Sequence, residues 1–511
     1  MASHPQTVGE SQRFVGDWVN YCAMPPVEKK RSHTRPPERG LSLSEHELAT
    51  AGNLLTEFLV SFERSLDHRP VMPVLDRDQL SDLLTTPFPN VGKGVEWLFR
   101  NIQENVVPNC TTVAHRRFLA YVLGPPNGIA PYAEAVAAAL NQNCNFWQLS
   151  PAASVIERRV ISWLGSLFGY PETAGGILTS GGSMANLMAL RVAMHEKAPI
   201  DLHKTGLSGL ASPLVVYTSA EAHRSVDKGA AILGLGSDHV HKIPVDADFR
   251  LRVDLLQAAI EADRRAGATP FCVVAAAGTV NTGAIDSIDE IGDLCDRESL
   301  WLHVDGAYGA LFVLSNQMKD WLFSCGRADS ITLDPHKLLF APLEAGCLLV
   351  RNREKLRKTF HFASSYLSAE QDQLLMNFLE YGPQLSRGFK AFKIWCSLQV
   401  FGIQAFRTAM ERMLELSRYM ATRVMAEPSL ELMAPVQLTA VCFRFKNGAS
   451  TQTILARLAE EGTALLGPVH LKGRDGIRAC ITNYRTNESD IDLVLDRLLQ
   501  LGRAAGPSSS S

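Results

Sequence analysis

Residues 301–310 read WLHVDGAYGA, and residues 330–338 read SITLDPHKL. In each stretch a short apolar run ends at an aspartate, Asp305 in the first and Asp334 in the second, and Lys337 follows Asp334 closely. Short apolar runs of this kind predict buried strands, and ligands of α/β sheets bind at the carboxyl ends of strands. A buried carboxylate needs a cationic partner or strong donors, because an unpaired buried charge is costly. We therefore expect Asp305 and Lys337 to serve one site.

Similar apolar runs alternate with helical patterns through the middle of the chain. They occupy residues 214–218, 239–245, 271–275, 300–304, 330–333 and 346–350. This alternation predicts a largely parallel α/β sheet with helices on both faces. A long helical stretch follows at about 386–425. After it we expect a second, smaller α/β unit with strands and helices at 438–445, 451–461, 477–483 and 489–501.

The N-terminal part of the chain does not share this pattern. Residues 34–40 read TRPPERG, and a Pro-rich segment of this kind predicts an extended arm. Ser44 and Glu47 form a capping box ahead of a helix that we expect at 45–66, and a second helix is expected at about 95–104.

The composition is typical of a globular protein. Of the 511 residues, 46% are hydrophobic and 20% are charged, so neither wholesale disorder nor a fibrous repeat is expected. The net charge of −3 gives no reason to expect nucleic acid. Without a long apolar stretch or an N-terminal signal segment, we expect a cytoplasmic protein that does not enter the membrane. Ten cysteines without a Cys-x-x-Cys pair predict reduced core thiols and no metal site.

Lys337 and Asp305 are the residue types that pyridoxal 5'-phosphate requires. The cofactor forms a Schiff base with a lysine, and an aspartate pairs with its protonated pyridine nitrogen. Each residue alone has a structural alternative, because an aspartate at a strand end is often a helix cap and a lone lysine is usually a surface residue. The combination favours the cofactor.

Both stretches resemble signatures of the group II pyridoxal-phosphate-dependent amino acid decarboxylases, which include aromatic L-amino acid, glutamate and cysteine sulfinate enzymes. The family's HVDAA and PHKW stand here as HVDGA at 303–307 and PHKL at 335–338. The two departures, Gly306 and Leu338, remove no cofactor-contacting group. The resemblance implies an α/β fold, the fold type I of pyridoxal-phosphate-dependent transferases, and a homodimer with its active sites at the interface.

Three domains are expected on this basis. They are an N-terminal arm and helical segment at 1–127, a large α/β domain that binds the cofactor at 128–397, and a small C-terminal α/β domain at 398–511. The last ends in the low-complexity segment GPSSSS at 506–511, which we expect to be disordered.

A phosphate site is expected in the segment LTSGGSMAN at 178–186, which leads into a helical pattern. Small residues and a serine ahead of a helix present free backbone donors and the positive end of the helix dipole. Read alone, the segment could be a linker. It is similar to the family's TSGGSEAN, which implies that Gly182 and Ser183 bind the cofactor, with Met184 in place of the usual glutamate.

The resemblance implies further cofactor contacts. His223, in YTSAEAHRSV at 217–226, would stack on one face of the pyridine ring and Ala307 would cover the other. Thr279 would lie near the cofactor, and Asp334 and His336 would complete the phosphate and backbone contacts. The structural alternatives are that His223 and Thr279 are ordinary helix caps.

The substrate pocket of the relatives matches two segments in the first third of the chain. HRRF at 115–118 resembles the family's His-Pro-x-Phe, and FWQLSPAA at 146–153 precedes a long helix. The side chains expected to line the substrate pocket are His115, Phe118, Tyr121 and Phe146. Each aromatic could equally be an ordinary core residue.

The segment after Phe362, through Ser365-Tyr366-Leu367 and on to Tyr381, matches the family's mobile lid. In decarboxylating relatives a lid tyrosine protonates the quinonoid carbon, and Tyr381 is our candidate for that role. A register set from Arg387 and Trp395 instead places Phe378 at the tyrosine position. A phenylalanine there is associated, in some relatives, with an aldehyde product.

The expected reaction is decarboxylation of an L-amino acid to its amine through a Schiff base at Lys337, with a proton returned by the lid or by His223. The aromatic residues favour an aromatic or bulky apolar substrate. Arg116 and Arg117 could instead pair with an acidic side chain, as in glutamate or cysteine sulfinate. The sequence is also compatible with an aldehyde-forming enzyme and with a catalytically silent relative that binds the cofactor.

Overall fold

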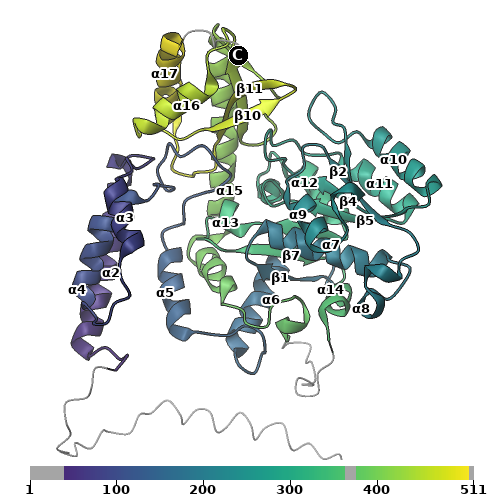
Figure 1. Cartoon of the computed structure of the whole chain (residues 1–511), viewed down its shortest axis with the longest axis horizontal. Helices are drawn as coiled ribbons and strands as arrows, with labels where there is room; N and C mark the ends of the chain where they lie inside the picture. The colour runs from purple at the N-terminus through teal and green to yellow at the C-terminus, as the bar shows by residue number, and fades with distance from the viewer. Residues whose placement is uncertain (1–39, 363–375, 506–511) are drawn as a thin grey trace, which may run out of the picture.

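The computed structural model describes residues 40–362 and 376–505. The predicted arm at 34–39, the tail at 506–511 and the lid residues Ser365-Tyr366-Leu367 lie outside the described residues. The described chain forms a group of N-terminal helices, a large sheet with helices packed around it, and a small sheet beside the large one (Figure 1).

The N-terminal helices lie side by side along one edge of the molecule (Figure 1). They are α2 (Glu45–Ser65), η2 (Leu66–His68), α3 (Arg77–Thr85), α4 (Val95–Asn101), the π-turn η3 (Ile102–Val106) and η4 (Val107–Asn109). The predicted capping box is confirmed, because Glu47 N donates to Ser44 Oγ at 3.3 Å and Ser44 N donates to Glu47 Oε2 at 2.9 Å. None of the residues of α2, α3 or α4 is buried.

The large sheet has seven strands in the order β1-β7-β6-β5-β4-β2-β3. The strands are β1 (Gly175–Thr179), β2 (Leu214–Ser219), β3 (Val240–Ile243), β4 (Thr269–Ala276), β5 (Trp301–Asp305), β6 (Ser330–Leu333) and β7 (Gly346–Val350). The six predicted strands are confirmed. The pairs from β6 to β3 are parallel, whereas β7 runs antiparallel to both of its neighbours. β1 was not predicted, since its first two residues are glycines.

The helices of this part of the chain come before, between and after the strands of the large sheet. They are α5 (Ala130–Leu140), α6 (Pro151–Ser166), α7 (Gly182–Lys197), α8 (Leu202–Thr205), α9 (Ser225–Ile232), α10 (Val253–Arg265), α11 (Ile288–Glu298), α12 (Lys319–Leu322), α13 (Pro335–Leu338) and α14 (Arg353–Phe360). Short turns of 3-10 helix lie between them at η5 (Leu207–Gly209), η6 (Ser237–His239), η7 (Ala310–Leu314), η8 (Phe323–Arg327) and η9 (Phe378–Glu380). α7 contacts five strands, β1 and β4 to β7, and buries small and apolar side chains such as Ala185, Met188 and Ala189.

The small sheet has four antiparallel strands in the order β10-β11-β9-β8. They are β8 (Leu430–Leu432), β9 (Ala440–Phe445), β10 (Gly467–Leu471) and β11 (Arg474–Cys480), with α16 (Thr451–Glu460) and α17 (Glu488–Ala505). α15 (Lys390–Ala426) joins the two sheets and is interrupted at Gly402, where φ is 66°. The predicted strands and helices are confirmed within a few residues. β8 and β10 were not predicted, because one is three residues long and the other begins Gly-Pro.

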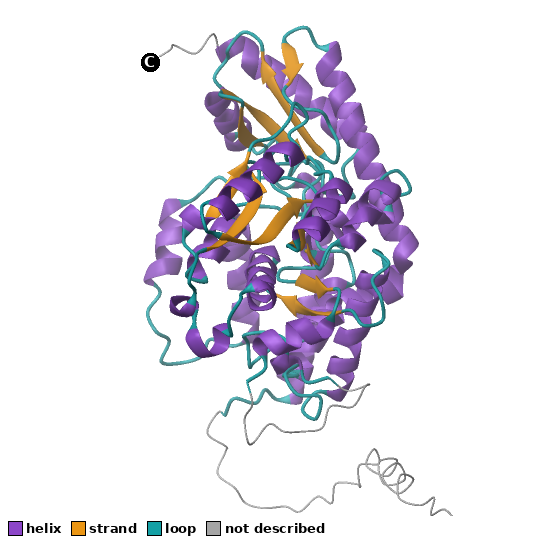
Figure 2. Cartoon of the chain, turned by 90° about the vertical axis from the view of Figure 1, so that its right-hand side faces the viewer, coloured by secondary structure: helices purple, strands orange, loops and turns teal. Residues whose placement is uncertain are grey.

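One continuous hydrophobic core extends through both sheets, which Figure 2 shows one above the other. Seven of the nine described cysteines are buried, and all nine are unpaired. Over residues 40–362 and 376–505, no helix has the length and apolar character that a membrane crossing needs. The same ranges hold no group of His, Cys, Asp or Glu side chains arranged to bind a metal ion.

Candidate active site

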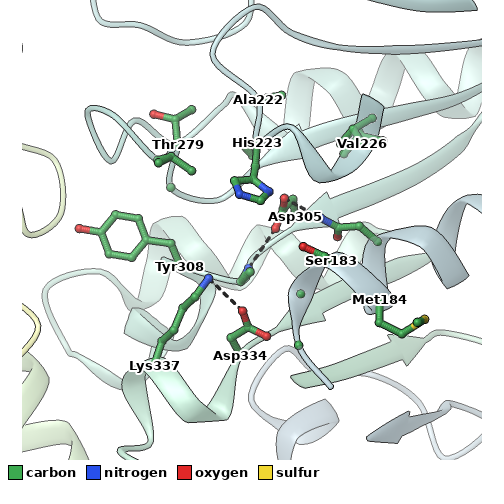
Figure 3. Close-up of a pocket in the computed structure, with 18 of the residues that line it drawn as sticks. Ser183, Met184, Ala222, His223, Val226, Thr279, Asp305, Tyr308, Asp334 and Lys337 are labelled. Atoms are coloured by element: carbon green, nitrogen blue, oxygen red, sulfur yellow. Dashed lines mark hydrogen bonds and ion pairs between the residues drawn. The ribbon is translucent and has the colours of Figure 1, made fainter. Parts of the chain in front are cut away.

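A cavity of about 370 Å³ lies where β4, β5 and β6 of the large sheet end. The structure brings together in its lining every residue that the sequence predicted to contact the cofactor, namely Gly182, Ser183, His223, Thr279, Asp305, Ala307, Asp334, His336 and Lys337. Figure 3 shows the side chains of Ser183, His223, Thr279, Asp305, Asp334 and Lys337 around one space. Topology explains the convergence, because parallel strands end at one edge of a sheet.

One wall of the cavity is the beginning of α7. Gly181 precedes this helix of 16 residues with φ 153°, and no side chain caps the helix N-terminus. A Cβ atom at Gly182 would lie 2.9 Å from Ala307 Cβ and 3.0 Å from Asp334 Oδ2, so the close approach of α7 requires glycine. Free backbone N–H groups and the positive end of a helix dipole suit a phosphate group.

Asp305 ends β5 and lines the same cavity. Its Oδ2 accepts a hydrogen bond from Asn186 Nδ2 at 2.8 Å, and its Oδ1 accepts one from Ala307 N at 3.2 Å. Both donors are neutral, so the carboxylate keeps its charge available for a cationic partner. The protonated nitrogen of a pyridine ring meets that requirement.

Lys337 lies on α13 and reaches into the cavity (Figure 3). Its Nζ atom is 2.9 Å from Oδ2 of Asp334, and the other oxygen of Asp334 is buried without a hydrogen-bond partner. The neighbouring His336 has Nδ1 2.8 Å from Ala345 O, and burial lowers the pKa of its ring, which is therefore neutral near pH 7. An amine beside the phosphate site and an anionic partner for a ring nitrogen together fit pyridoxal phosphate.

His223 and Thr279 complete the predicted set. His223 follows β2, and its Nδ1 atom is 2.8 Å from Ser225 Oγ and accepts from Ser225 N at 3.1 Å. Figure 3 shows the His223 ring close to Asp305. The hydroxyl of Thr279 accepts from Ala284 N at 3.1 Å. It therefore closes the turn after β4 and does not cap α11, which was the structural alternative.

The predicted lid residues do not line this cavity. Phe378 is fully buried in η9, with the guanidinium of Arg387 5.1 Å from its ring centroid. Tyr381 is also buried, and burial raises its pKa to about 12. In this chain both aromatic rings pack in the core beside α14, away from Lys337.

The predicted substrate residues are likewise absent from the cavity lining. His115 is buried and accepts from Arg117 N at 3.0 Å, and burial lowers its pKa to about 4. Phe118 pairs through its backbone with Leu465, next to the small sheet. Tyr121 is largely exposed, and Phe146 is partly buried near the start of α6. All four lie in the described chain but outside the residues that surround Lys337.

Two residues that the sequence reasoning missed do line the cavity. Asn186 lies one helical turn after Gly182, so the spacing within the Gly-rich motif could have placed it on the same face of α7. Tyr308 follows Ala307, and its hydroxyl is 2.7 Å from Thr439 Oγ1 and accepts from Thr439 N at 3.2 Å. Tyr308 therefore links the cavity wall to the segment that leads into β9.

The chain is similar to known proteins over most of its length. The model of the pyridoxal-dependent decarboxylase conserved domain matches residues 78–446. An aromatic-L-amino-acid decarboxylase from Bacillus atrophaeus is 36% identical over 90% of this chain and 96% of its own. An L-2,4-diaminobutyrate decarboxylase from Rhizobium meliloti is 33% identical over 82% of this chain and 84% of its own. The crystal structure of mouse CSAD superimposes with a TM-score of 0.83 at 26% identity, over 90% of this chain and 98% of that one.

These similarities agree with the cavity geometry and confirm three predictions, which are the fold type I architecture, the pyridoxal phosphate cofactor and the reaction class. The chain belongs to the family of pyridoxal-phosphate-dependent amino acid decarboxylases.

Proposed function

We propose that the protein decarboxylates an aromatic or bulky apolar L-amino acid and releases the amine. The observation that carries this choice is the apolar part of the cavity lining. It is formed by apolar and aromatic side chains, which are Met184, Val226, Val280, Tyr308 and Leu343. Within the described ranges, the residues lining this cavity include no arginine that could hold an acidic side chain.

The two arginines that could pair with an acidic substrate have other partners. Arg116 Nε lies 3.0 Å from Asp67 Oδ1 and 3.8 Å from Asp490 Oδ2. Arg117 Nε donates to Thr463 O at 2.7 Å, and its Nη1 lies 4.0 Å from Asp490 Oδ1. Neither lines the cavity. This arrangement favours the aromatic or apolar substrate over glutamate or cysteine sulfinate, in keeping with the identity to the Bacillus atrophaeus enzyme.

The residues of the cavity would divide the work as follows. Bound pyridoxal phosphate supplies an electron sink for the charge left on Cα when the carboxylate departs as carbon dioxide. The N-terminus of α7, at Gly182 and Ser183, would hold the phosphate, and Asp305 would hold the proton on the pyridine nitrogen. Lys337 would hold the cofactor through its amine until the amine of the substrate displaces it.

A proton must then be returned to Cα. We assign this step to His223, because its ring lies in the cavity whereas Tyr381 is buried outside it. Ala307 would leave room for the pyridine ring on the face opposite His223, and the apolar wall would exclude water from the reacting carbon.

The same proposal includes a homodimer. Apolar side chains are exposed along the N-terminal helices and the segments that join them, among them Leu48, Leu55, Val74, Leu84, Phe88, Trp97 and Leu98. An exposed apolar surface of this extent is typical of a protein interface. Light scattering should give twice the mass of one chain, and Trp97→Asp with Leu98→Asp should reduce it to one. The control Glu57→Gln, on the exposed surface of α2, should leave the mass unchanged.

Two further parts of the proposal concern location and domain boundaries. The buried, unpaired thiols of residues such as Cys272 and Cys347 support a reducing, cytoplasmic compartment.

We place the domain boundaries after residues 127 and 397. The interruption of α15 at Gly402, shortly after the second boundary, supports that division.

The substrate is tested by incubating the cofactor-loaded enzyme with a pool of L-amino acids, L-dopa, cysteine sulfinate and diaminobutyrate, followed by mass spectrometry. An amine from an aromatic or bulky apolar member is expected, and Arg117→Met should leave that product in place. Amine from glutamate or cysteine sulfinate that disappears in Arg117→Met would establish the acidic alternative. An aldehyde with hydrogen peroxide would establish the oxidative alternative, and no turnover of any member would contradict the proposal.

A further inference from the structure

A continuous chain of hydrogen bonds leads from Trp301, the first residue of β5, to His223 in the cavity lining. It passes through Asn186, which is 1% exposed and contacts three partners at once. The successive members of the chain are Trp301, Ser330, His303, Asn186, Ser225 and His223. Each link is between 2.8 and 3.0 Å long.

The direction of the links is set at Asp305, whose carboxylate oxygen can only accept, so Asn186 turns its NH₂ group to Asp305 and its Oδ1 to His303 Nε2. Trp301 Nε1 donates to Ser330 Oγ at 2.9 Å, so the single hydroxyl proton of Ser330 is free to donate to His303 Nδ1 at 2.8 Å. Burial holds the pKa of His303 below its ordinary value, so the ring is neutral and carries one proton. That proton lies on Nε2, because Nε2 faces the acceptor Asn186 Oδ1, and Nδ1, which also lies 3.2 Å from Ser330 O, accepts from Ser330 Oγ.

This orientation of the Asn186 amide satisfies both of its ends. His303 Nε2 donates to Asn186 Oδ1 at 3.0 Å, and the NH₂ group of Asn186 faces the other way. Its two hydrogens go to Asp305 Oδ2 at 2.8 Å and to Ser225 Oγ at 2.8 Å. The reverse orientation would set the amide oxygen against the carboxylate of Asp305 and would leave His303 Nε2 facing a donor.

The last link sets the tautomer of His223. Ser225 Oγ accepts from Asn186, so its own proton points to His223 Nδ1 at 2.8 Å. The backbone N–H of Ser225 donates to the same nitrogen at 3.1 Å. Two donors converge on Nδ1, which therefore accepts, and the proton of a neutral His223 lies on Nε2.

We propose that Asn186 is a positioning residue that orients the carboxylate of Asp305 and, through Ser225, fixes the proton of neutral His223 on Nε2. The inference rests on the proposed contacts of Asp305 and His223 with the cofactor. The Asn186 amide would thereby set the orientation of the Asp305 carboxylate, which would pair with the pyridine nitrogen. It would also set which nitrogen of His223 carries the proton that could move to Cα. The orientation of Asp305 and the tautomer of His223 therefore depend on the same residue.

The tautomer is measured directly by nuclear magnetic resonance of enzyme labelled with ¹⁵N in its histidines, without and with pyridoxal phosphate. The resonances of His223 are assigned by their absence from His223→Gln. For the neutral ring in the wild-type enzyme, a one-bond ¹⁵N–¹H coupling is expected at Nε2 and not at Nδ1. A proton found on Nδ1 would overturn the inference.

Asn186→Asp is the sharpest variant, because it keeps the shape of the side chain and removes both donors. Ser225 Oγ would then donate to the new carboxyl group, and His223 Nδ1 would keep only the backbone N–H of Ser225 as a donor, so a population of His223 protonated at Nδ1 should appear beside the Nε2 form. The dissociation constant of pyridoxal phosphate, measured by its absorbance, should rise by about tenfold or more, since hydrogen bonds to a charged group are among the stronger ones. An unchanged tautomer and unchanged cofactor affinity would refute the role of Asn186.

Matched controls separate this role from a loss of folding. Asn483→Asp alters another buried amide, which donates to His115 O at 2.9 Å, and should leave the resonances of His223 unchanged. Asn186→Leu also removes the donors, but it adds no carboxyl group, so it should raise the dissociation constant less than Asn186→Asp does. The resonance readout needs no substrate. If no aromatic amino acid is turned over but Nε2 carries the proton, the substrate proposal fails and this inference stands.

Discussion

The Nζ atom of Lys337 lies 2.9 Å from Oδ2 of Asp334, whose side chain is 3% exposed. The two residues stand one turn apart at the beginning of α13, so the same turn that brings the amine into the cavity also supplies its counterion. Asp334 needs this partner, because its other oxygen is already buried without a hydrogen bond.

Replacing Lys337 should therefore reduce both activity and stability. Lys337→Gln removes the amine that holds the cofactor, so activity should be lost, and it leaves a buried carboxylate without a cation. We expect the free energy of unfolding of the cofactor-free protein to fall by about 2 kcal/mol, measured by urea titration. The double variant Lys337→Gln with Asp334→Asn should regain most of that stability and none of the activity. Equal stability of Lys337→Gln and the wild type would contradict this account.

Gly182→Ala should weaken cofactor binding with little change in the rest of the fold. The added Cβ atom would lie 2.9 Å from Ala307 Cβ, a contact that forces α7 or β5 to shift. Overpacking of this kind costs about 1–3 kcal/mol, so the dissociation constant of pyridoxal phosphate should rise by about tenfold. Absorbance titration measures it. The control is Gly388→Ala, where a Cβ atom would meet nothing within 4 Å and binding should not change.

The cofactor site was accessible from sequence because its chemistry demands particular residue types. Few lysines and aspartates stand at the ends of apolar runs. The topology of a parallel sheet then places the ends of those strands together. The tight packing of β1 against β7 could not be predicted from the sequence in the same way. A Cβ atom at Gly176 would lie 2.3 Å from Leu348 O, so this glycine reflects a close approach to β7 that alternation of apolar residues does not reveal.

Residues whose role depends on tertiary packing were harder to predict from the sequence. Asn186 reads as an ordinary polar residue in a helix until α7 is packed against β5, where the amide meets Asp305 and His303. The family resemblance implies lid positions for Tyr381 and Phe378. Their burial depends on the turn η9 and on Arg387, and neither has a local signal in the sequence.

The buried ion pair between Glu157 and Arg387 should make a large contribution to stability. Both side chains are almost inaccessible, and Arg387 also donates to Cys144 O at 2.8 Å and to Leu178 O at 3.1 Å. Glu157→Gln would leave the guanidinium buried without its anion, which costs about 3–5 kcal/mol. Denaturant unfolding should show this loss.

An exposed pair gives the comparison for that experiment. Arg252 and Asp254 also form an ion pair, but on the surface, where water screens the charges. Asp254→Asn should therefore leave the unfolding midpoint unchanged. A similar loss in both variants would mean that burial is not what makes the Glu157 pair important.

Acid should destabilise the protein partly through His115. Burial lowers the pKa of His115 to about 4 in the folded state, whereas an unfolded histidine titrates near 6.5. Between these values the unfolded chain binds more protons than the folded one, so stability is full above about pH 6.5 and falls as the pH is lowered toward 4. His115→Gln keeps an acceptor for Arg117 N and removes the titration, so it should flatten this decline by roughly 2 kcal/mol.

The measurement is the free energy of unfolding at a series of pH values from 4 to 8, for the wild type and for two variants. His470→Gln is the control, because this ring lies on the surface of the small sheet beside Asp475 and is largely exposed. Its pH profile should follow that of the wild type. If His115→Gln loses stability in acid as steeply as the wild type, the protonation of other buried rings, such as His303, must account for the decline.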